Sequence, residues 1–434
     1  MENQQNEGLK RELSVWDVAI NVINISISSG IFILPALIAG ILGNASIVAY
    51  ILCGFMMLLV CLCYAEVGSR ITSSGGAYAY IEKAFGAYFG FLANGFLWFG
   101  VGVMVLAAII NGVADMLSVA FPIFETGIYR NLFFLVLLGL MAFVNIRGVK
   151  EGILAVKLLT IIKTVPLVLV VLVGLFSLKT TNLTWQGFPT FDKLGEASLI
   201  LFFAFTGGEM SLNISGEMKN PNRTGPLGLI IGIVSIVVFY CLIQIVAQGI
   251  LGGALVTNQK APIAATAQEL FGSFGFTVML GCAIAAMVGC LNSIVLVFPR
   301  VMFAGAKDGL LPHFLSKLHP KYATPHLGIL TFTTLAFIMA ISGGYKQLLI
   351  LATLSSLLLN VGVALAAIKF RLRPITNNQA AFTLSGGLAI PIATLIILCW
   401  FIGQSKSNEI IGTAVFIGVL SVLYLVKLFK PKNK

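Results

Sequence analysis

Two short polar segments interrupt long apolar stretches, and they are the places where the sequence could bind a small molecule. The first is the segment Ser26–Gly30, inside an apolar stretch that continues past Pro35. The second is the segment Thr206–Glu209, which lies about ten residues into another apolar stretch. Serine, glycine and β-branched residues form helices poorly, so we expect each apolar helix to break at its polar segment.

A helix break can bind a ligand without any charged side chain. The first half of a broken helix ends in free C=O groups with partial negative charge, and the second half begins with free N–H groups. An amino acid zwitterion has one group for each end. We expect its carboxylate at the N–H groups of Ser29, Gly30 and Ile31, and its ammonium at carbonyls near Ser26, Phe203, Ala204 and Thr206. The alternative is that the small residues only allow neighbouring helices to pack closely.

The composition shows what kind of element must carry these segments. The chain of 434 residues has 58% hydrophobic and only 10% charged residues, with a mean hydropathy of +1.00. A soluble domain has about 25% charged residues, so this chain is expected to be an all-α integral membrane protein. A helix needs about 20 apolar residues to cross a bilayer, and the apolar windows predict twelve transmembrane helices, with the first turn near Gly43 and Asn44.

The basic residues predict the orientation. Of the 27 Lys and Arg residues, 19 fall on the side of the N-terminus when the twelve spans alternate, and six fall on the other side. By the positive-inside rule, both termini should be cytoplasmic in a multi-pass protein of the cell membrane. The expected organisation is a cytoplasmic segment at 1–14, one twelve-helix domain at 15–428 and a cytoplasmic tail at 429–434.

The two interrupted stretches are the first and the sixth predicted spans. Interrupted helices in corresponding positions of two halves indicate a transporter built from inverted repeats, with its binding site at the interruptions. We therefore expect a 5+5 inverted repeat, formed by spans 1–5 and 6–10.

Four motifs resemble the amino acid, polyamine and organocation (APC) superfamily of permeases. They are ISSGIFILP in the first span, YAEVGSRITSSGGAYAYIEKAFG after the second, FFAFTGGEMSLNISGEMKNPNRTGP around the sixth, and AKDGLLPHFLSKLHPKYATP after the eighth. The resemblance implies a LeuT-type fold with discontinuous spans 1 and 6, peripheral spans 11 and 12, and an aromatic gate at Phe203. The implied binding residues are Ser26, Ile27, Ser28, Ser29, Gly30, Ile31, Phe203, Ala204, Thr206 and Gly207. Ser28 and Gly208 depart from the superfamily pattern, which leaves the pocket shape open.

Two ionisable residues lie deep in predicted spans. Lys163 is in the middle of the fifth span and resembles a lysine that occupies the cation position in some sodium-independent APC relatives. We expect its ammonium to reach carbonyls of the first broken helix and Ser293, either as a proton carrier or as a purely structural cation. Glu209 is either a gate residue, as in exchangers of cationic substrates, or a cap for the second half of span 6. Glu217, Lys219 and Arg223 are expected to form a cytoplasmic gate network.

The predicted function is sodium-independent secondary transport of a neutral amino acid, by proton symport or exchange. The alternative is an exchanger of a cationic amino acid or polyamine, with Glu209 as the counter-charge. The expected partners are the amino acid, protons and the lipid bilayer, without nucleic acid, metal or cofactor. The sequence has no HExxH or GxSxG motif, no repeated filter motif and no Walker motif, so an enzyme, a channel or an ATP-driven pump is not expected.

Overall fold

The computed structural model describes residues 13–71, 76–147, 153–185, 187–209, 211, 218–219, 221–307, 309–373 and 386–429. These residues form helices joined by short connections, with one isolated β-bridge between Leu13 and Met218. Most of the predicted N-terminal segment (1–12) and of the predicted tail (430–434) lies outside the described residues. The prediction of an all-helical membrane protein is confirmed.

The α-helices follow one another along the chain with short gaps. They are α1 (Val15–Ser26), α2 (Ser29–Leu42), α3 (Ser46–Arg70), α4 (Gly76–Phe85), α5 (Ala87–Gly95), α6 (Met104–Ala120), α7 (Ile128–Arg147), α8 (Ile153–Phe176), α9 (Phe191–Phe205), α10 (Pro221–Leu251), α11 (Ala254–Thr257), α12 (Pro262–Lys307), α13 (His326–Ser342), α14 (Tyr345–Leu372), α15 (Ala389–Gly403) and α16 (Ser407–Phe429). The π-helical segment η2 (Phe96–Val103) joins α5 to α6. The 3₁₀ segments are η1 (Gly43–Ala45), η3 (Pro122–Phe124), η4 (Thr180–Leu183) and η6 (His313–Ser316).

Seven helical stretches among the described residues are long and apolar enough to cross a membrane. They are Ser29–Arg70, Ala87–Ala120, Ile128–Arg147, Arg223–Leu251, Pro262–Lys307, Tyr345–Leu372 and Ser407–Val426. The stretch Ser29–Arg70 turns at η1, where Gly43 has a φ of +55°, as predicted. Four shorter apolar helices accompany these stretches: Val15–Ser26, Ile162–Phe176, His326–Ser342 and Ala389–Gly403.

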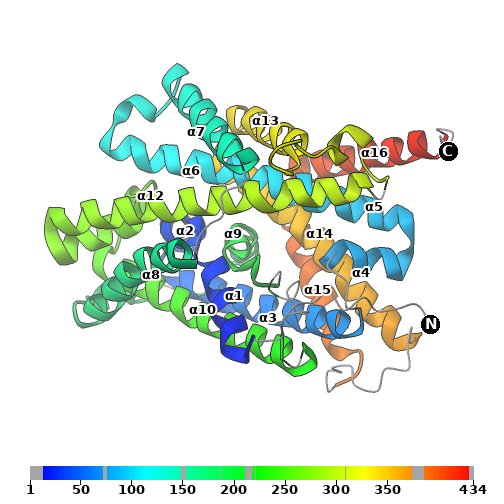
Figure 1. Ribbon diagram of the computed structural model, residues 1–434. Coiled ribbons are helices and arrows are strands. Elements are labelled where there is room, and N and C mark those ends of the chain that lie inside the picture. Colours follow the sequence, from blue (N-terminus) through cyan, green and yellow to red (C-terminus); the bar gives the residue numbers. More distant parts are fainter. Residues whose placement is uncertain are drawn as a thin grey trace.

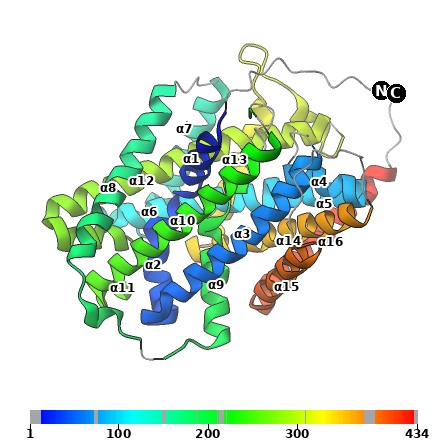
Figure 2. The same ribbon diagram turned by 90° about the horizontal axis from the view of Figure 1, so that it is seen from below.

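The helices interrupted at the polar segments lie in the middle of the bundle. Figure 1 shows α9 almost end-on near the centre, with α1 and α2 beside it and α12 crossing next to them. Helix α1 packs on α10, and α2 packs on α9 and α12. Figure 2 shows α15 and α16 on one side of the bundle. Only 6% of the residues in the apolar window of α16 are buried, so this helix is peripheral.

A buried ion cluster ties α3 to α14. Glu66, near the end of α3, is 1% exposed and accepts hydrogen bonds from Arg70, at 2.8 Å, and from Arg371. Arg70 also donates to the carbonyl of Phe370, at 2.7 Å. Moving the two helices apart would leave the buried Glu66 carboxylate without its partner on α14, and an uncompensated buried charge is unfavourable. The cluster therefore holds the end of α3 against the end of α14. The end of the bundle that contains this cluster is termed the α3 end.

Candidate functional site

The first break separates α1 from α2. Helix α1 stops at Ser26, and Ile27 (φ −71°, ψ 86°) and Ser28 (φ −130°, ψ −149°) leave the helical conformation before α2 begins at Ser29. The Ser28 side chain makes no capping hydrogen bond to α2. The first-turn N–H groups of α2 are therefore not capped by the residue that normally does so.

The second break follows α9. Thr206 is extended (ψ 155°), and Gly207 has a φ of +104°, a conformation that favours glycine. The carbonyl of Phe203 accepts both the amide of Thr206, at 3.2 Å, and its hydroxyl, at 2.8 Å. The chain thus satisfies one of the carbonyls at the end of α9 with its own next residue.

The two breaks lie against each other. A Cβ atom added to Gly30 would lie 2.8 Å from the Cβ of Ala204, and one added to Gly207 would lie 3.0 Å from Ile25. The small residues therefore allow close packing as well as a break, so the two interpretations of these segments are compatible. Gly208, one of the departures from the superfamily pattern, packs against Val22 of α1, where an added Cβ would approach to 2.9 Å.

A tyrosine of α10 joins the carbonyl ends of both broken helices. The Tyr240 hydroxyl lies 2.6 Å from the carbonyl oxygen of Ser26 and 3.2 Å from that of Ala204, and donates to them. Its side chain is 1% exposed. The sequence analysis did not predict a role for Tyr240. A tyrosine in the middle of an apolar span could have indicated one, because a buried tyrosine hydroxyl usually has a hydrogen-bond partner.

Lys163 contacts the end of α1. Its Nζ donates to the carbonyl of Asn24, at 2.6 Å, and to that of Ile27, at 3.1 Å. A cation at the C-terminal end of a helix is stabilised by the free carbonyls there. Ser293 instead donates to the carbonyl of Gly289 in its own helix, and its side chain is exposed.

Glu209 is folded back on the second break. Its Oε2 accepts the amide of Gly207, at 2.8 Å, and its side chain is buried. The contact lies within the break itself, and most of the segment that Glu209 was expected to cap (210, 212–217 and 220) lies outside the described residues, so both interpretations of Glu209 stay predictions. Glu209 also lines the cavity described below. Of the expected gate network, Glu217 lies outside the described residues, and Lys219 and Arg223 are exposed.

A cavity of about 580 Å³ adjoins both breaks. The predicted site residues on its wall are Ser28, Phe203, Thr206, Gly207 and Glu209. The other residues predicted at the breaks are buried beside it: Ser26, Ile27, Ser29, Gly30, Ile31 and Ala204. Small-molecule sites usually measure about 300–1,000 Å³, so the cavity is large enough for an amino acid.

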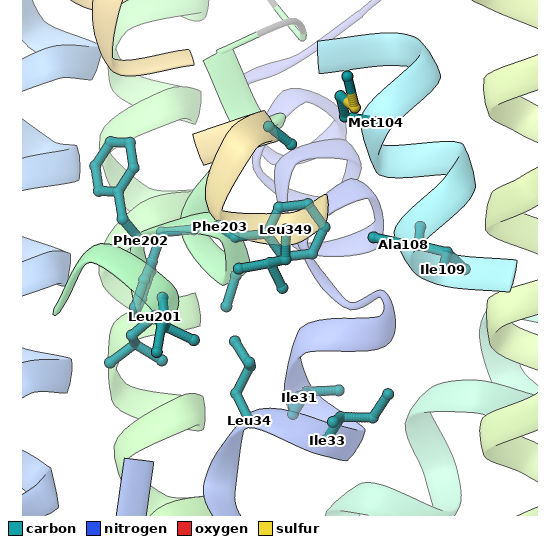
Figure 3. Packing of buried hydrophobic residues seen from close by; sticks show 14 of the residues in the cluster. Ile31, Ile33, Leu34, Met104, Ala108, Ile109, Leu201, Phe202, Phe203 and Leu349 are labelled. Carbon is teal, nitrogen blue, oxygen red and sulfur yellow. The ribbon is translucent and has the colours of Figure 1, made fainter. Parts of the chain in front are cut away.

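The cavity extends from the breaks toward the α3 end. Tyr64 of α3, Gly76–Tyr78 of α4, and Arg300 and Ala304 of α12 line it on that side. On the other side of the breaks, Ile31 and Leu34 of α2 and Leu349 of α14 are buried; they belong to the same apolar cluster as Phe203, part of which Figure 3 shows. The site is therefore walled off by apolar packing from one end of the bundle.

Comparison with known proteins identifies the family. A sequence profile described as amino acid permease matches residues 13–426. The chain belongs to the amino acid permease family, within the APC superfamily.

Three relatives from Bacillus subtilis (strain 168) illustrate the similarity. The permease is 30% identical to the serine/threonine exchanger SteT over 341 residues, 77% of each chain. It is 27% identical to the branched-chain amino acid permease BcaP over 421 residues, 91% of this chain and 88% of the relative. It is also 26% identical to a methylthioribose transporter over 447 residues, 97% of this chain and 94% of the relative.

The cavity wall of the permease includes polar residues that sequence reasoning did not select. Ser356 and Asn360 of α14 and Tyr64 of α3 line it, and Tyr64 donates a hydrogen bond to Asn360, at 3.1 Å. Ser356 and Asn360 are four residues apart in an apolar helix, so they share one face. This spacing of two polar residues in an apolar helix could have indicated their place in the site from the sequence.

Outside the spans, the permease has an ion pair at the end opposite the cavity. The Lys260 ammonium, before α12, lies 2.6 Å from a carboxylate oxygen of Glu125, which follows η3. The hydrogen bond from Lys260 lowers the pKa of Glu125 below its usual range. The carboxylate is therefore ionised at neutral pH and links two connections on this surface.

Proposed function

We propose that the chain is a secondary active transporter, and not an enzyme, that moves small neutral amino acids across the cell membrane by alternating access. Transport is sodium-independent and runs by proton symport or by exchange. The observation that supports this proposal most strongly is the pair of adjacent helix breaks beside a cavity. The cavity extends from the breaks toward the α3 end, and buried apolar side chains pack on the other side of the breaks. SteT and BcaP, as relatives named for serine/threonine and branched-chain amino acids, support the substrate class.

The breaks offer a binding group to each end of an amino acid. The substrate carboxylate binds at the start of α2, where the N–H groups of Ser29, Gly30 and Ile31 follow the uncapped Ser28. The two lone pairs of the Phe203 carbonyl are already used by Thr206. The carbonyls of Ser26 and Ala204 share the single proton of the Tyr240 hydroxyl, so each keeps a lone pair for another donor. The substrate ammonium therefore binds toward these two carbonyls.

The position of Lys163 supports sodium-independent transport. Its ammonium donates to two carbonyls at the end of α1, which are the kind of oxygen ligand that would otherwise coordinate a cation. A fixed positive charge there satisfies the carbonyls and repels a sodium ion. The same group is the candidate proton carrier, with a purely structural cation as the alternative role.

Topology completes the proposal. With twelve spans, a 5+5 inverted repeat and both termini in the cytoplasm, the cavity mouth opens to the cytoplasmic side, because α3 ends there. Basic side chains at this end, among them Arg70, Arg300 and Arg371, agree with the positive-inside rule. The structure then corresponds to an inward-facing state.

A second candidate is an exchanger of cationic amino acids or polyamines. It is favoured by Glu209, the acidic residue among the described residues of the cavity wall, and by 27% identity over 338 residues to cationic amino acid transporter 9 of Arabidopsis thaliana, covering 72% of this chain and 58% of that relative. Against it, Glu209 already binds the Gly207 amide, and no second acidic residue stands on the described cavity wall.

Uptake by the purified protein in liposomes tests the proposal. Labelled serine, threonine, alanine, leucine and arginine are offered with and without sodium, with and without a pH gradient, and with unlabelled amino acid inside. We expect uptake of neutral amino acids that does not depend on sodium and rises with a pH gradient or with internal substrate. Sodium-dependent uptake that ignores both would refute the coupling, and arginine or putrescine outcompeting alanine would favour the second candidate.

A further inference from the structure

A polar row on α14 faces the cavity without belonging to either broken helix. Ser356 and Asn360 are one helical turn apart and both line the cavity. The main-chain groups at the breaks account for the carboxylate and the ammonium of an amino acid. The α14 row is therefore available to the part of the substrate that differs between amino acids, its side chain.

The Asn360 amide has one unused donor group. Its Oδ1 accepts the hydroxyl of Tyr64, at 3.1 Å, whereas its Nδ2 is buried and has no hydrogen-bond partner. Asn360 is 2% exposed and Tyr64 is 5% exposed, so neither group is bathed by bulk solvent. A buried donor without an acceptor is unfavourable, and native structures rarely keep one without a reason.

Among the described residues, no acceptor on the surrounding wall is paired with the Asn360 Nδ2 group. Phe203, Ile294, Val297 and Leu359 present hydrocarbon to the cavity. The Oε2 of the nearby acidic residue, Glu209, is bonded to the amide of Gly207. The hydroxyl of Tyr64 is directed at the other atom of the same amide. Tyr64 thereby fixes the orientation of Asn360 and leaves its NH₂ group for a ligand.

Resting on the proposed function, we propose that Asn360 is the specificity residue for the substrate side chain, and that it selects small neutral amino acids with a hydroxyl or amide oxygen. The Nδ2 group donates to that oxygen. A carboxylate side chain is disfavoured because it would share the cavity with Glu209, and an aliphatic side chain leaves the donor unpaired. Serine, threonine and asparagine are therefore better substrates than alanine, valine and leucine.

Threonine and valine provide the sharpest comparison, because they have nearly the same shape and differ by one hydroxyl group. One hydrogen bond to a neutral donor changes affinity by roughly 3- to 10-fold. We expect the full-length protein in liposomes to show a kcat/KM for threonine about 3- to 10-fold above that for valine. In Asn360→Leu, which keeps the side-chain size, the ratio should fall to near one.

A neighbouring serine supplies the control. The Ser355 hydroxyl donates to the carbonyl of Leu351 in its own helix, at 3.0 Å, and the residue packs against Gly100 instead of lining the cavity. Ser355→Ala should keep the threonine-to-valine ratio of the unmodified protein. The ratio in the unmodified protein is itself a test that requires no variant to fold.

The outcomes separate this inference from the function on which it rests. A threonine-to-valine ratio near one in the unmodified protein, or a ratio that persists in Asn360→Leu, would overturn the role of Asn360 while amino acid transport stands. Failure to transport any amino acid of the panel would refute the proposed function, and the specificity assignment with it.

Discussion

Replacing Tyr240 by phenylalanine tests whether the two breaks act as one site. The change removes a single oxygen atom and keeps the buried ring, so packing around the ring is preserved. It takes away the donor that lies 2.6 Å from the Ser26 carbonyl and 3.2 Å from the Ala204 carbonyl. Since a hydroxyl has one proton, the shorter contact accounts for most of the effect.

The size of the effect follows from the burial of these groups. Ser26 and Ala204 are 1% and 2% exposed, so water cannot readily replace the lost donor. Leaving a buried acceptor unpaired costs about 1–3 kcal/mol, which corresponds to a factor of roughly 5 to 150 in an equilibrium constant. We expect the Tyr240→Phe protein to fold and to lose transport activity by about tenfold, because the carbonyl ends no longer keep their bound geometry.

The assay is initial uptake of labelled substrate into liposomes, together with the shift of the melting temperature on adding substrate in detergent. Tyr88→Phe is the matched control, because the Tyr88 hydroxyl forms one hydrogen bond, at 2.8 Å, with Ser421 of the peripheral helix α16. It should lower stability slightly and leave uptake near that of the unmodified protein. If Tyr240→Phe and Tyr88→Phe transport equally well, the joining of the two breaks through Tyr240 has no role in transport.

Three further changes test single contacts. Lys163→Met leaves the carbonyls at the end of α1 without their charged donor, a loss of about 1.5–3 kcal/mol per bond, so uptake should fall at least tenfold. The control Lys346→Met breaks an exposed ion pair and should change uptake less than about twofold. Equal effects of the two changes would contradict the role of Lys163. Gly207→Ala adds a side chain at a φ of +104°, costs about 1–2 kcal/mol and should lower uptake and melting temperature. Gly418→Ala, inside helix α16 with open space around it, should leave uptake unchanged and should not lower the melting temperature, because alanine favours a helix more than glycine does. Because the folded-state pKa of Glu125 is lowered, its ion pair stabilises the protein at pH values above the ordinary pKa of 4.5, and this contribution is lost as the pH falls below that value. The melting-temperature difference between the unmodified protein and Glu125→Gln should therefore be present at pH 7 and shrink below pH 4.5. A difference that grows in acid would contradict this linkage.

The helix breaks were predictable because their causes are local. Glycine, serine and β-branched residues disfavour a helix wherever they occur, and several of them in succession within an apolar stretch are enough to end it. The structure places the ends of α1 and α9 at Ser26 and Phe205, at the predicted segments. The contact of Lys163 with the first broken helix is also present, since a deep lysine has few acceptors within reach apart from such carbonyls.

The remaining parts of the site depend on which helices meet, and local sequence does not encode that. Tyr240 and Asn360 look like ordinary members of apolar spans until α10 and α14 are placed beside the breaks. Ser293 was expected near Lys163, yet its hydroxyl bonds within α12. The kink of α12 at Gly272, with a φ of +67°, has a local cause, because glycine adopts positive φ readily and none of the described residues packs within 4 Å of this position.

The contact between Gly30 and Ala204 restricts how this protein can evolve. The space between these two positions holds one methyl group, and the chain places that group on residue 204, because a second Cβ at residue 30 would lie only 2.8 Å from it. An alanine in place of Gly30 would be tolerated more readily where the opposite residue had become glycine, because the closer of its two contacts with residue 204, 2.8 Å to Cβ and 3.1 Å to Cα, would then be gone. Related sequences should therefore exchange the two residue types in a correlated manner, although the two positions lie far apart along the chain.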